Sequence, residues 1–328
     1  MIHLSFIFVS TEKLSGTNEV TRRRTKTPAD LGLSDEPMVV GPEDSPTAHL
    51  RAKLDAQLRA LLAHEPGTRS GADPEDLHQM RVAVRRMRSV LKLSEDPAAQ
   101  HVRAELKLLG SVLGEVRDYD VLIDHLRTTV AGFGEQDLQA ADQLIAAFAA
   151  QRDQAKRRLN QALNTARYTA LLTAIGELTK TAEVANAPDD GRLDPATALR
   201  KPYRRLVRAA AALPNNPPDD ELHAVRIRGK RLRYAAELAV PAAKKKQAAR
   251  LKALVKATKR LQDVLGDHQD AVVAADRVRN LAVTSDERMV GFIAGRIVER
   301  EANRRAEARA AWPDALAGVN KLAARLLP

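Results

Sequence analysis

Two segments of the sequence place a histidine at one end of a regular series of arginine and lysine residues. Residues three, four and seven positions apart share one face of an α-helix, so each series would form a narrow band of positive charge. A guanidinium group can bind two phosphate oxygens at once, and a lysine adds an adaptable point charge. The pattern therefore favours binding of a polyanion. The first basic stripe consists of His78, Arg81, Arg85, Arg88 and Lys92, and the second of His223, Arg226, Lys230 and Arg233.

Positive charge is concentrated in the second stripe and in the residues that follow it. From His223 to Arg260 the chain has 13 Lys or Arg residues and one acid, Glu237, whereas its formal net charge is +11. Like charges one helical turn apart repel each other, and a bound polyanion would turn that repulsion into attraction. The alternative is a solvated surface on which some of the 42 Asp and Glu residues neutralise these cations. A lysine row on one further helix face consists of Lys245, Lys252, Lys256 and Lys259.

The composition excludes several classes of protein. The 328 residues include no cysteine, which excludes a disulfide scaffold, a thiolate zinc site and a cysteine nucleophile. Aromatic residues make up 3% of the chain, too few for base stacking to dominate the affinity for a nucleic acid. No apolar run approaches the roughly 20 residues of a membrane span, and the opening MIHLSFIFVS lacks the features of a signal peptide. A cytoplasmic protein without a membrane partner is expected.

The spacing of apolar residues predicts an all-α protein. From Thr47 onward, apolar residues recur every three or four positions, whereas residues 1–46 lack this periodicity and are predicted to be disordered. Helix starts are expected at Asp73-Pro74 and around Asp219, because acids cap free N–H groups and proline fits the first turn. The predicted helices span residues 47–64, 74–93, 97–116, 118–131, 135–163, 166–184, 195–213, 219–240, 242–265, 268–283 and 285–310.

The two halves of the sequence repeat each other. The segment LHQMRVAVRRMR from Leu77 matches LHAVRIRGKRLR from Leu222, and VLGEVRDYDVL from Val112 matches VLGDHQDAVVA from Val264. A linker rich in Pro, Asp and Gly, at about 186–194, separates a first half, about 47–185, from a second half, about 195–328. We therefore expect two tandem helical bundles that arose by internal duplication.

The repeated histidines and aspartates allow more than one role. His78 and His223 could each donate a hydrogen bond to a phosphate, act as a general acid–base, or be core residues bonded to a carbonyl group. Their place at the end of an arginine series favours phosphate contact. Asp118, Asp120 and Asp270 could bind a metal, but they are more typical of acids that cap a helix start or pair with arginine on a facing helix. Neither a metal site nor a cofactor is expected, because no phosphate-binding Gly loop, HExxH or GxSxG motif is present.

The paired H-x-x-R-x-x-x-[RK]-R-x-R segments resemble those of the CHAD family, the conserved histidine α-helical domain. The resemblance begins at LHQMRVAVRRMR and LHAVRIRGKRLRY and extends through LGEVRDYDVL and LQDVLGDHQDAV, so that it covers most of the chain. It implies two similar helical bundles related by pseudo-two-fold symmetry, with basic residues of both lining a central groove or pore. It also implies binding of inorganic polyphosphate and association with polyphosphate granules.

The resemblance also implies which residues bind. CHAD domains often follow a CYTH triphosphatase domain, but its Glu-x-Glu-x-Lys signature is absent and the residues before Thr47 are too few for its catalytic tunnel. A stand-alone CHAD protein that is not an enzyme is therefore expected. The matching positions are His78, Arg81, Arg85, Arg86 and Arg88 in the first half, His223, Arg226, Lys230, Arg231 and Arg233 in the second, and Lys107 and Lys259 in the second motif pair.

Three functions are consistent with these residues. The first is binding of linear polyphosphate by cations that converge on one channel. The second is nonspecific nucleic-acid binding, which the net positive charge favours. The third is metal-dependent cleavage of phosphoanhydrides by the two histidines together with Asp118 and Asp270. The stripes and the family resemblance together favour the first function.

Overall fold

The computed structural model describes residues 25–41, 44–183, 195–240 and 243–327, and within these ranges the chain is helical and forms no β-strand. The all-α prediction is confirmed. The side chains of Asp73 and Asp96 accept hydrogen bonds from free backbone N–H groups, and a proline follows each as the first helical residue. None of the described helices is long and apolar enough to cross a membrane. The helices are α1 (Pro46–Ser70), α2 (Pro74–Val90), α3 (Pro97–Val130), α4 (Glu135–Leu163), α5 (Ala166–Thr181), α6 (Pro195–Ala211), α7 (Asp219–Ala239), α8 (Lys245–Val283) and α9 (Arg288–Ala323), with short 3-10 helices η1 (Ala29–Leu31) and η2 (Leu91–Leu93).

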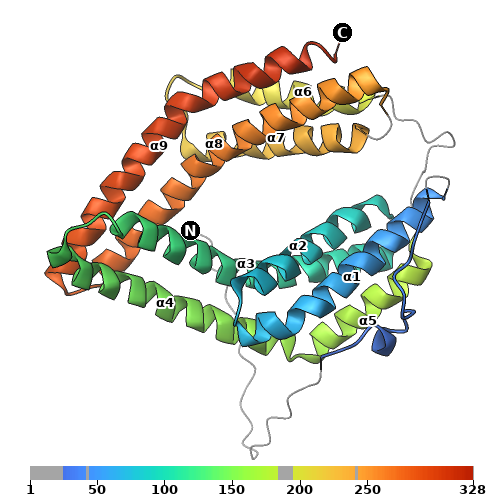
Figure 1. The fold of residues 1–328 in the computed structure, drawn as a ribbon, viewed down its shortest axis with the longest axis horizontal. Helices are drawn as coiled ribbons and strands as arrows, with labels where there is room; N and C mark the ends of the chain where they lie inside the picture. The colour runs from blue at the N-terminus through green and yellow to red at the C-terminus, as the bar shows by residue number, and fades with distance from the viewer. Residues whose placement is uncertain (1–24, 42–43, 184–194, 241–242, 328) are drawn as a thin grey trace, which may run out of the picture.

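The helices form two arms that meet at one end of the molecule (Figure 1). The first arm contains α1, α2 and α5 with the adjoining parts of α3 and α4, and the second contains α6 and α7 with the adjoining parts of α8 and α9. A third core, which we call the junction, is built from the remaining parts of α3, α4, α8 and α9 around residues such as Leu126, Phe148 and Ile293. Helix α2 lies on the side of its arm that faces the other arm, and α7 does the same (Figure 1).

Helices α3 and α8 run without a break from an arm into the junction. The predicted breaks near residues 117 and 266 are wrong. The acids that resembled a helix start instead pair with arginines of other helices: Asp118 lies 3.9 Å from Arg277, and Asp120 is bonded to Arg152. Helix α9 likewise continues to Ala323, beyond its predicted end at residue 310. Continuous helices are needed because each of these elements contributes to two cores.

Part of the segment predicted to be disordered packs against the first arm. Residues 1–24 and the predicted linker at 186–194 lie outside the described residues, but residues 25–41 make defined contacts. Leu31 is buried in the first arm, the backbone N–H of Met38 donates to Asp55 at 3.0 Å, and Arg59 donates to the carbonyl group of Ser34 at 2.8 Å. The prediction of disorder is wrong here, because these contacts use one leucine and backbone groups, which leave no periodic pattern in the sequence.

In each arm a glycine allows close packing between the stripe helix and the helix that follows it. Val84 of α2 lies 3.4 Å from the point that a Cβ atom on Gly110 of α3 would occupy. In the second arm the glycine is on α7, where a Cβ atom on Gly229 would lie 3.5 Å from Leu261 of α8. Gly229 stands at the position of Val84 in the sequence repeat. The partners on the second helix are not equivalent, because the repeat aligns Gly110 with Gln262 and Leu261 with Leu109, so each arm packs this contact in its own way.

Candidate polyanion-binding site

Helices α2 and α7 present the two basic stripes from equivalent positions. His78 is the fifth residue of α2, and His223 is the fifth residue of α7. The opposite face of each helix is apolar and buried in its arm, which leaves the cations at the boundary with solvent. The buried residues behind the stripes include Leu77, Met80, Val84 and Met87 of α2 and Leu222, Val225 and Leu232 of α7.

The cations of the stripes lack acidic partners. In the part of the chain that the structure describes, the only stripe residue that makes an ion pair is Arg233, which contacts Glu237 at 3.3 Å. Several arginines outside the stripes do have acidic partners, for example Arg69 with Glu65 at 2.6 Å. Among the described residues no other acid therefore lies within 4.0 Å of a stripe cation. The predicted residues on exposed positions are Arg85, Arg86, Lys92, Lys107, Arg231, Lys252, Lys256 and Lys259.

One arginine of each stripe lies over a glycine of the next helix. Nε of Arg81 is 3.7 Å from the point that a Cβ atom on Gly114 would occupy, and Nε of Arg226 is 3.6 Å from the equivalent point on Gly266. Nε of Arg226 is buried and has no hydrogen-bond partner among the described residues. The two arms thus hold equivalent arginines in the same way, with the terminal guanidinium nitrogens still able to meet a ligand.

The histidines of the two stripes share an unusual feature. Nδ1 of His78 and Nδ1 of His223 are both buried without a hydrogen-bond partner within the described ranges. A missing hydrogen bond at a buried polar atom costs about 1–3 kcal/mol. The hypothesis of a core histidine bonded to a carbonyl group is therefore wrong for this nitrogen in both helices.

A pocket of about 510 Å³ lies where the arms meet, and we call it the junction pocket. His78 and Arg81 of the first stripe line it, whereas no residue of the second stripe does. Most of its other charged residues were not predicted, because they come from α3, α8 and α9 and belong to no repeated spacing. In the region of α9 the sequence predicts a helix at 285–310 but no site residue. The remaining charged and histidine lining residues are Arg117, Asp118, His125, Asp270, Arg277 and Arg304.

Asp270 links the junction pocket to the second stripe. Its side chain faces the pocket, yet the surrounding helices desolvate it enough to raise its pKa above the ordinary value of 3.8. The positive charge of Arg226 in the second stripe opposes this effect and lowers the pKa.

A buried glutamate joins two helices behind the junction pocket. Glu301 of α9 is 1% exposed. One of its carboxylate oxygens lies 2.6 Å from Nε2 of His125 on α3, and the other accepts a hydrogen bond from Arg304 at 2.8 Å. These contacts use both oxygens of the carboxylate, so Arg304 and His125 have a structural partner that Arg81 lacks.

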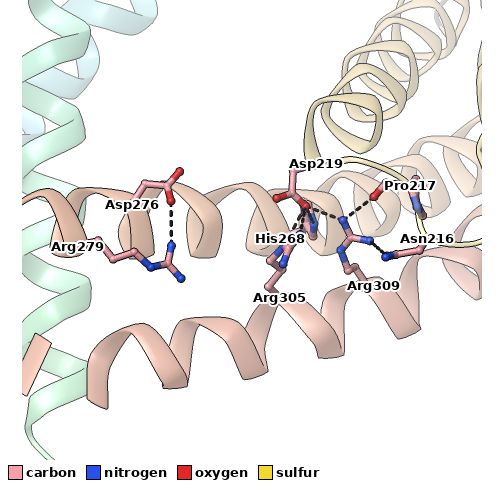
Figure 2. A network of polar contacts seen from close by, with 8 residues as sticks. All are labelled: Asn216, Pro217, Asp219, His268, Asp276, Arg279, Arg305 and Arg309. Atoms are coloured by element: carbon pink, nitrogen blue, oxygen red, sulfur yellow. Dashed lines mark hydrogen bonds and ion pairs between the residues drawn. The ribbon is translucent and has the colours of Figure 1, made fainter. Parts of the chain in front are cut away.

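A second polar cluster fixes the start of α7 (Figure 2). Asp219 accepts hydrogen bonds from Arg305 at 2.8 Å and Arg309 at 2.7 Å, both on α9, and lies 3.1 Å from Nε2 of the buried His268 on α8. The predicted helix start is confirmed, but the predicted capping role of Asp219 is wrong: it makes no cap bond because its carboxylate is held by α9. The cluster ties α7 to two neighbouring helices and so positions the second stripe.

The fold brings together only some of the residues that would be needed for phosphoanhydride cleavage. His78, Asp118 and Asp270 line the junction pocket, but His223 does not. Within the described ranges, no group of three or more His, Cys, Asp or Glu residues could hold a metal ion. The nearest partner of Asp118 among these residues is Arg277, as in the alternative of a pair with a facing helix.

Comparison with known proteins agrees with the motifs and the helical architecture. The CHAD domain family matches residues 52–279, a range that includes both stripes and the parts of α3 and α8 that line the junction pocket. The chain belongs to the CHAD domain family. Two proteins from two strains of Mycobacterium tuberculosis, both named as uncharacterized, are 30% identical over 259 residues, which cover 75% of this chain and 48% of each relative. The chain thus spans about half the length of these relatives.

Solved structures have the same fold. The CHAD domain from the plant Ricinus communis matches with a TM-score of 0.65 and 25% identity, over 87% of this chain and 95% of that domain. PptA from Streptomyces chartreusis matches with a TM-score of 0.59 and 22% identity, over 82% of this chain and 98% of PptA. The second likeness concerns the fold alone.

Proposed function

We propose that this protein binds inorganic polyphosphate through the two basic stripes. The observation that carries the proposal is the lack of acidic partners: among the described stripe residues, only Arg233 makes an ion pair. A chain of phosphates would supply the missing negative charge, and its release of counterions would make the affinity depend steeply on salt. Membership of the CHAD family, which is linked to polyphosphate binding, supports the same ligand.

The binding residues divide into two groups by position. His78 and Arg81 would contact phosphates at the junction pocket, together with Arg117. The other predicted cations would bind the part of the polyphosphate chain that extends from the pocket along α2, α7 and α8. We further propose that the protein binds without hydrolysing, acts in the cytoplasm, and associates there with polyphosphate granules.

The test is a titration with labelled long-chain polyphosphate at several salt concentrations, with duplex DNA as competitor. Arg81→Ala and Arg226→Ala should each weaken binding by about 1–3 kcal/mol, the value of a charge-assisted hydrogen bond. Arg158→Ala is the matched control, since Arg158 is exposed and already paired with Glu115. Unchanged affinity in both stripe variants, with helicity intact by circular dichroism, would remove the stripes from the site.

Two further outcomes separate the competing functions. Equal displacement of polyphosphate by DNA of the same charge would reduce the site to a general polyanion surface and favour nucleic-acid binding. Release of phosphate that requires a divalent metal and disappears in His78→Ala would favour the hydrolase. Intact polyphosphate after long incubation supports binding alone.

A further inference from the structure

Helix α6 of the second arm has charged residues of one sign only. Its sequence, PATALRKPYRRLVRAAA, contains cations and no acid. Leu199 and Leu206 are buried on one face. The cations are exposed on the opposite face, and none of them makes an ion pair within the described residues. They are Arg200, Lys201, Arg204, Arg205 and Arg208.

Three of these arginines border a cleft of about 650 Å³, which we call the α6 cleft. Arg200, Arg204 and Arg208 follow one another at intervals of one helical turn, so the row is about 12 Å long. The C-terminal end of the chain forms the facing side, with Ala324 and Leu327. The α6 cleft shares no residue with the junction pocket or with either stripe.

The wall of the cleft is held in place by a contact between helices. The hydroxyl group of Tyr203 donates to Oδ1 of Asn320 on α9 at 3.2 Å, and burial raises the pKa of this tyrosine above its ordinary value. The hydroxyl group therefore stays protonated and keeps donating. This bond fixes α6 against α9, so the arginine row is presented by a supported helix.

Helix α1 is the contrasting case, in which acids of the same helix neutralise two of the arginines. Its Arg59 and Arg69 lie one turn from Asp55 and Glu65, and each pairs with that acid. Helix α6 has the same kind of spacing without the acids. Like charges at this spacing repel one another. Because α6 has no acid to offset this repulsion, a bound anion would stabilise the row.

We propose that the α6 cleft is a second binding site for the phosphate groups of a linear polyanion, used when one polyphosphate chain is long enough to reach both the stripes and α6. This inference rests on the proposed function. A single row of arginines in a cleft suits one unbranched chain, whereas a duplex would present two separated phosphate backbones. Occupying both sites with one molecule raises its affinity, because the second contact is intramolecular.

The experiment compares three variants with tripolyphosphate and with long-chain polyphosphate. The first carries Arg200→Gln, Arg204→Gln and Arg208→Gln. The second carries Arg81→Gln and Arg226→Gln. The control carries Arg158→Gln, Arg167→Gln and Arg279→Gln, which remove the same charge from exposed arginines that have acidic partners.

The α6 variant should lose about tenfold in affinity for the long chain and keep its affinity for tripolyphosphate, since only the long chain reaches both sites. Its salt dependence should become shallower by roughly one unit of slope per lost phosphate contact. The stripe variant should weaken with both ligands, and the control should match the wild type.

The outcomes distinguish the inference from the proposed function. If the wild-type protein binds neither ligand, the proposed function fails. If it binds both and the α6 variant retains long-chain affinity and salt slope, the α6 site is overturned while the stripes stand. If the α6 variant loses affinity for duplex DNA but not for polyphosphate, the cleft is a nucleic-acid site and the inference is likewise overturned.

Discussion

Arg81 of α2 and Arg304 of α9 line the same pocket, but only Arg304 has an acidic partner. Arg304 donates to the buried Glu301 at 2.8 Å, and His125 approaches the other oxygen of that carboxylate. Arg81 makes no ion pair among the described residues and lies over Gly114. The same residue type therefore has two roles in one pocket, and the position of the nearest acid decides which role it has.

The same contrast extends to whole helices. The arginines that α9 directs at Asp219 connect it to α7, and Arg304 contacts both Glu301 on its own helix and His125 on α3. The cations of α2 and α7 connect nothing within the described chain, apart from Arg233 with Glu237 on the same helix. Paired arginines should therefore contribute to stability, and unpaired arginines to ligand binding.

The largest expected effect is on stability, at the buried acid of the junction. Glu301→Ala leaves Arg304 and His125 without their shared partner, and should lower the free energy of unfolding by about 1.5–3 kcal/mol, the range for hydrogen bonds to charged groups. Urea unfolding followed by circular dichroism measures the change, with Glu301→Gln as an isosteric control that should lose less. An unchanged midpoint in Glu301→Ala would contradict the assignment of a structural role.

A matched pair of substitutions on the first arm tests the other side of the contrast. Arg85→Gln removes an exposed, unpaired cation and should weaken polyphosphate binding by about 1 kcal/mol while changing stability by less than about 0.5 kcal/mol. Arg69→Gln removes the partner of the buried Glu65 and should do the reverse. The same variants are measured by titration and by urea unfolding. If both variants lose stability and neither loses affinity, the presence of an acidic partner does not distinguish stabilising arginines from ligand-binding arginines.

The sequence predicts the stripes well because their spacing is local. His78, Arg81 and Arg85 follow the helical period, and the repeat in the second half identifies the same pattern independently. The all-α class follows from the same periodicity. The choice of helix face also follows, since apolar residues such as Met80 and Val84 occupy the opposite side.

The junction could not be predicted in the same way, because its contacts join residues far apart in the chain. His125 meets Glu301 across 176 positions, and no local spacing marks either residue. Asp118 and Asp120 looked like a helix start for the same reason: their partners, Arg277 and Arg152, become neighbours only after folding. A polar residue inside a long helix therefore cannot be interpreted as a cap until its tertiary partner is known.

A smaller effect on stability should appear with pH at the cluster that fixes α7. Burial lowers the pKa of His268 below its ordinary value of 6.5, Asp219 opposes this, and Arg309 and Arg305 reinforce it. Below pH 6.5 the unfolded chain therefore binds more protons than the folded chain, so stability falls as the pH decreases toward the lower pKa of the folded state. The pKa of Asp219 is lowered from 3.8, so its own contribution persists throughout this window. In His268→Gln the free energy of unfolding should fall less steeply between about pH 7 and 5 than in the wild type. The same pH dependence of the free energy of unfolding in variant and wild type would contradict this role of His268.

The smallest effect concerns the one stripe cation that does have a partner. Arg233 contacts Glu237 one turn away at 3.3 Å, and the glutamate is 45% exposed. Such pairs contribute about 0.3–0.5 kcal/mol, so Glu237→Gln should release Arg233 and tighten polyphosphate binding by roughly twofold at a small loss of stability. The control is Glu177→Gln, which frees Lys180 on α5, away from the stripes, and should leave the affinity unchanged. A gain in Glu237→Gln that disappears when Arg233 is also replaced by Gln would show that the released guanidinium, and not the lost negative charge alone, contacts the ligand. An equal gain in both backgrounds would show the opposite, namely that the lost negative charge of Glu237 alone accounts for the tighter binding.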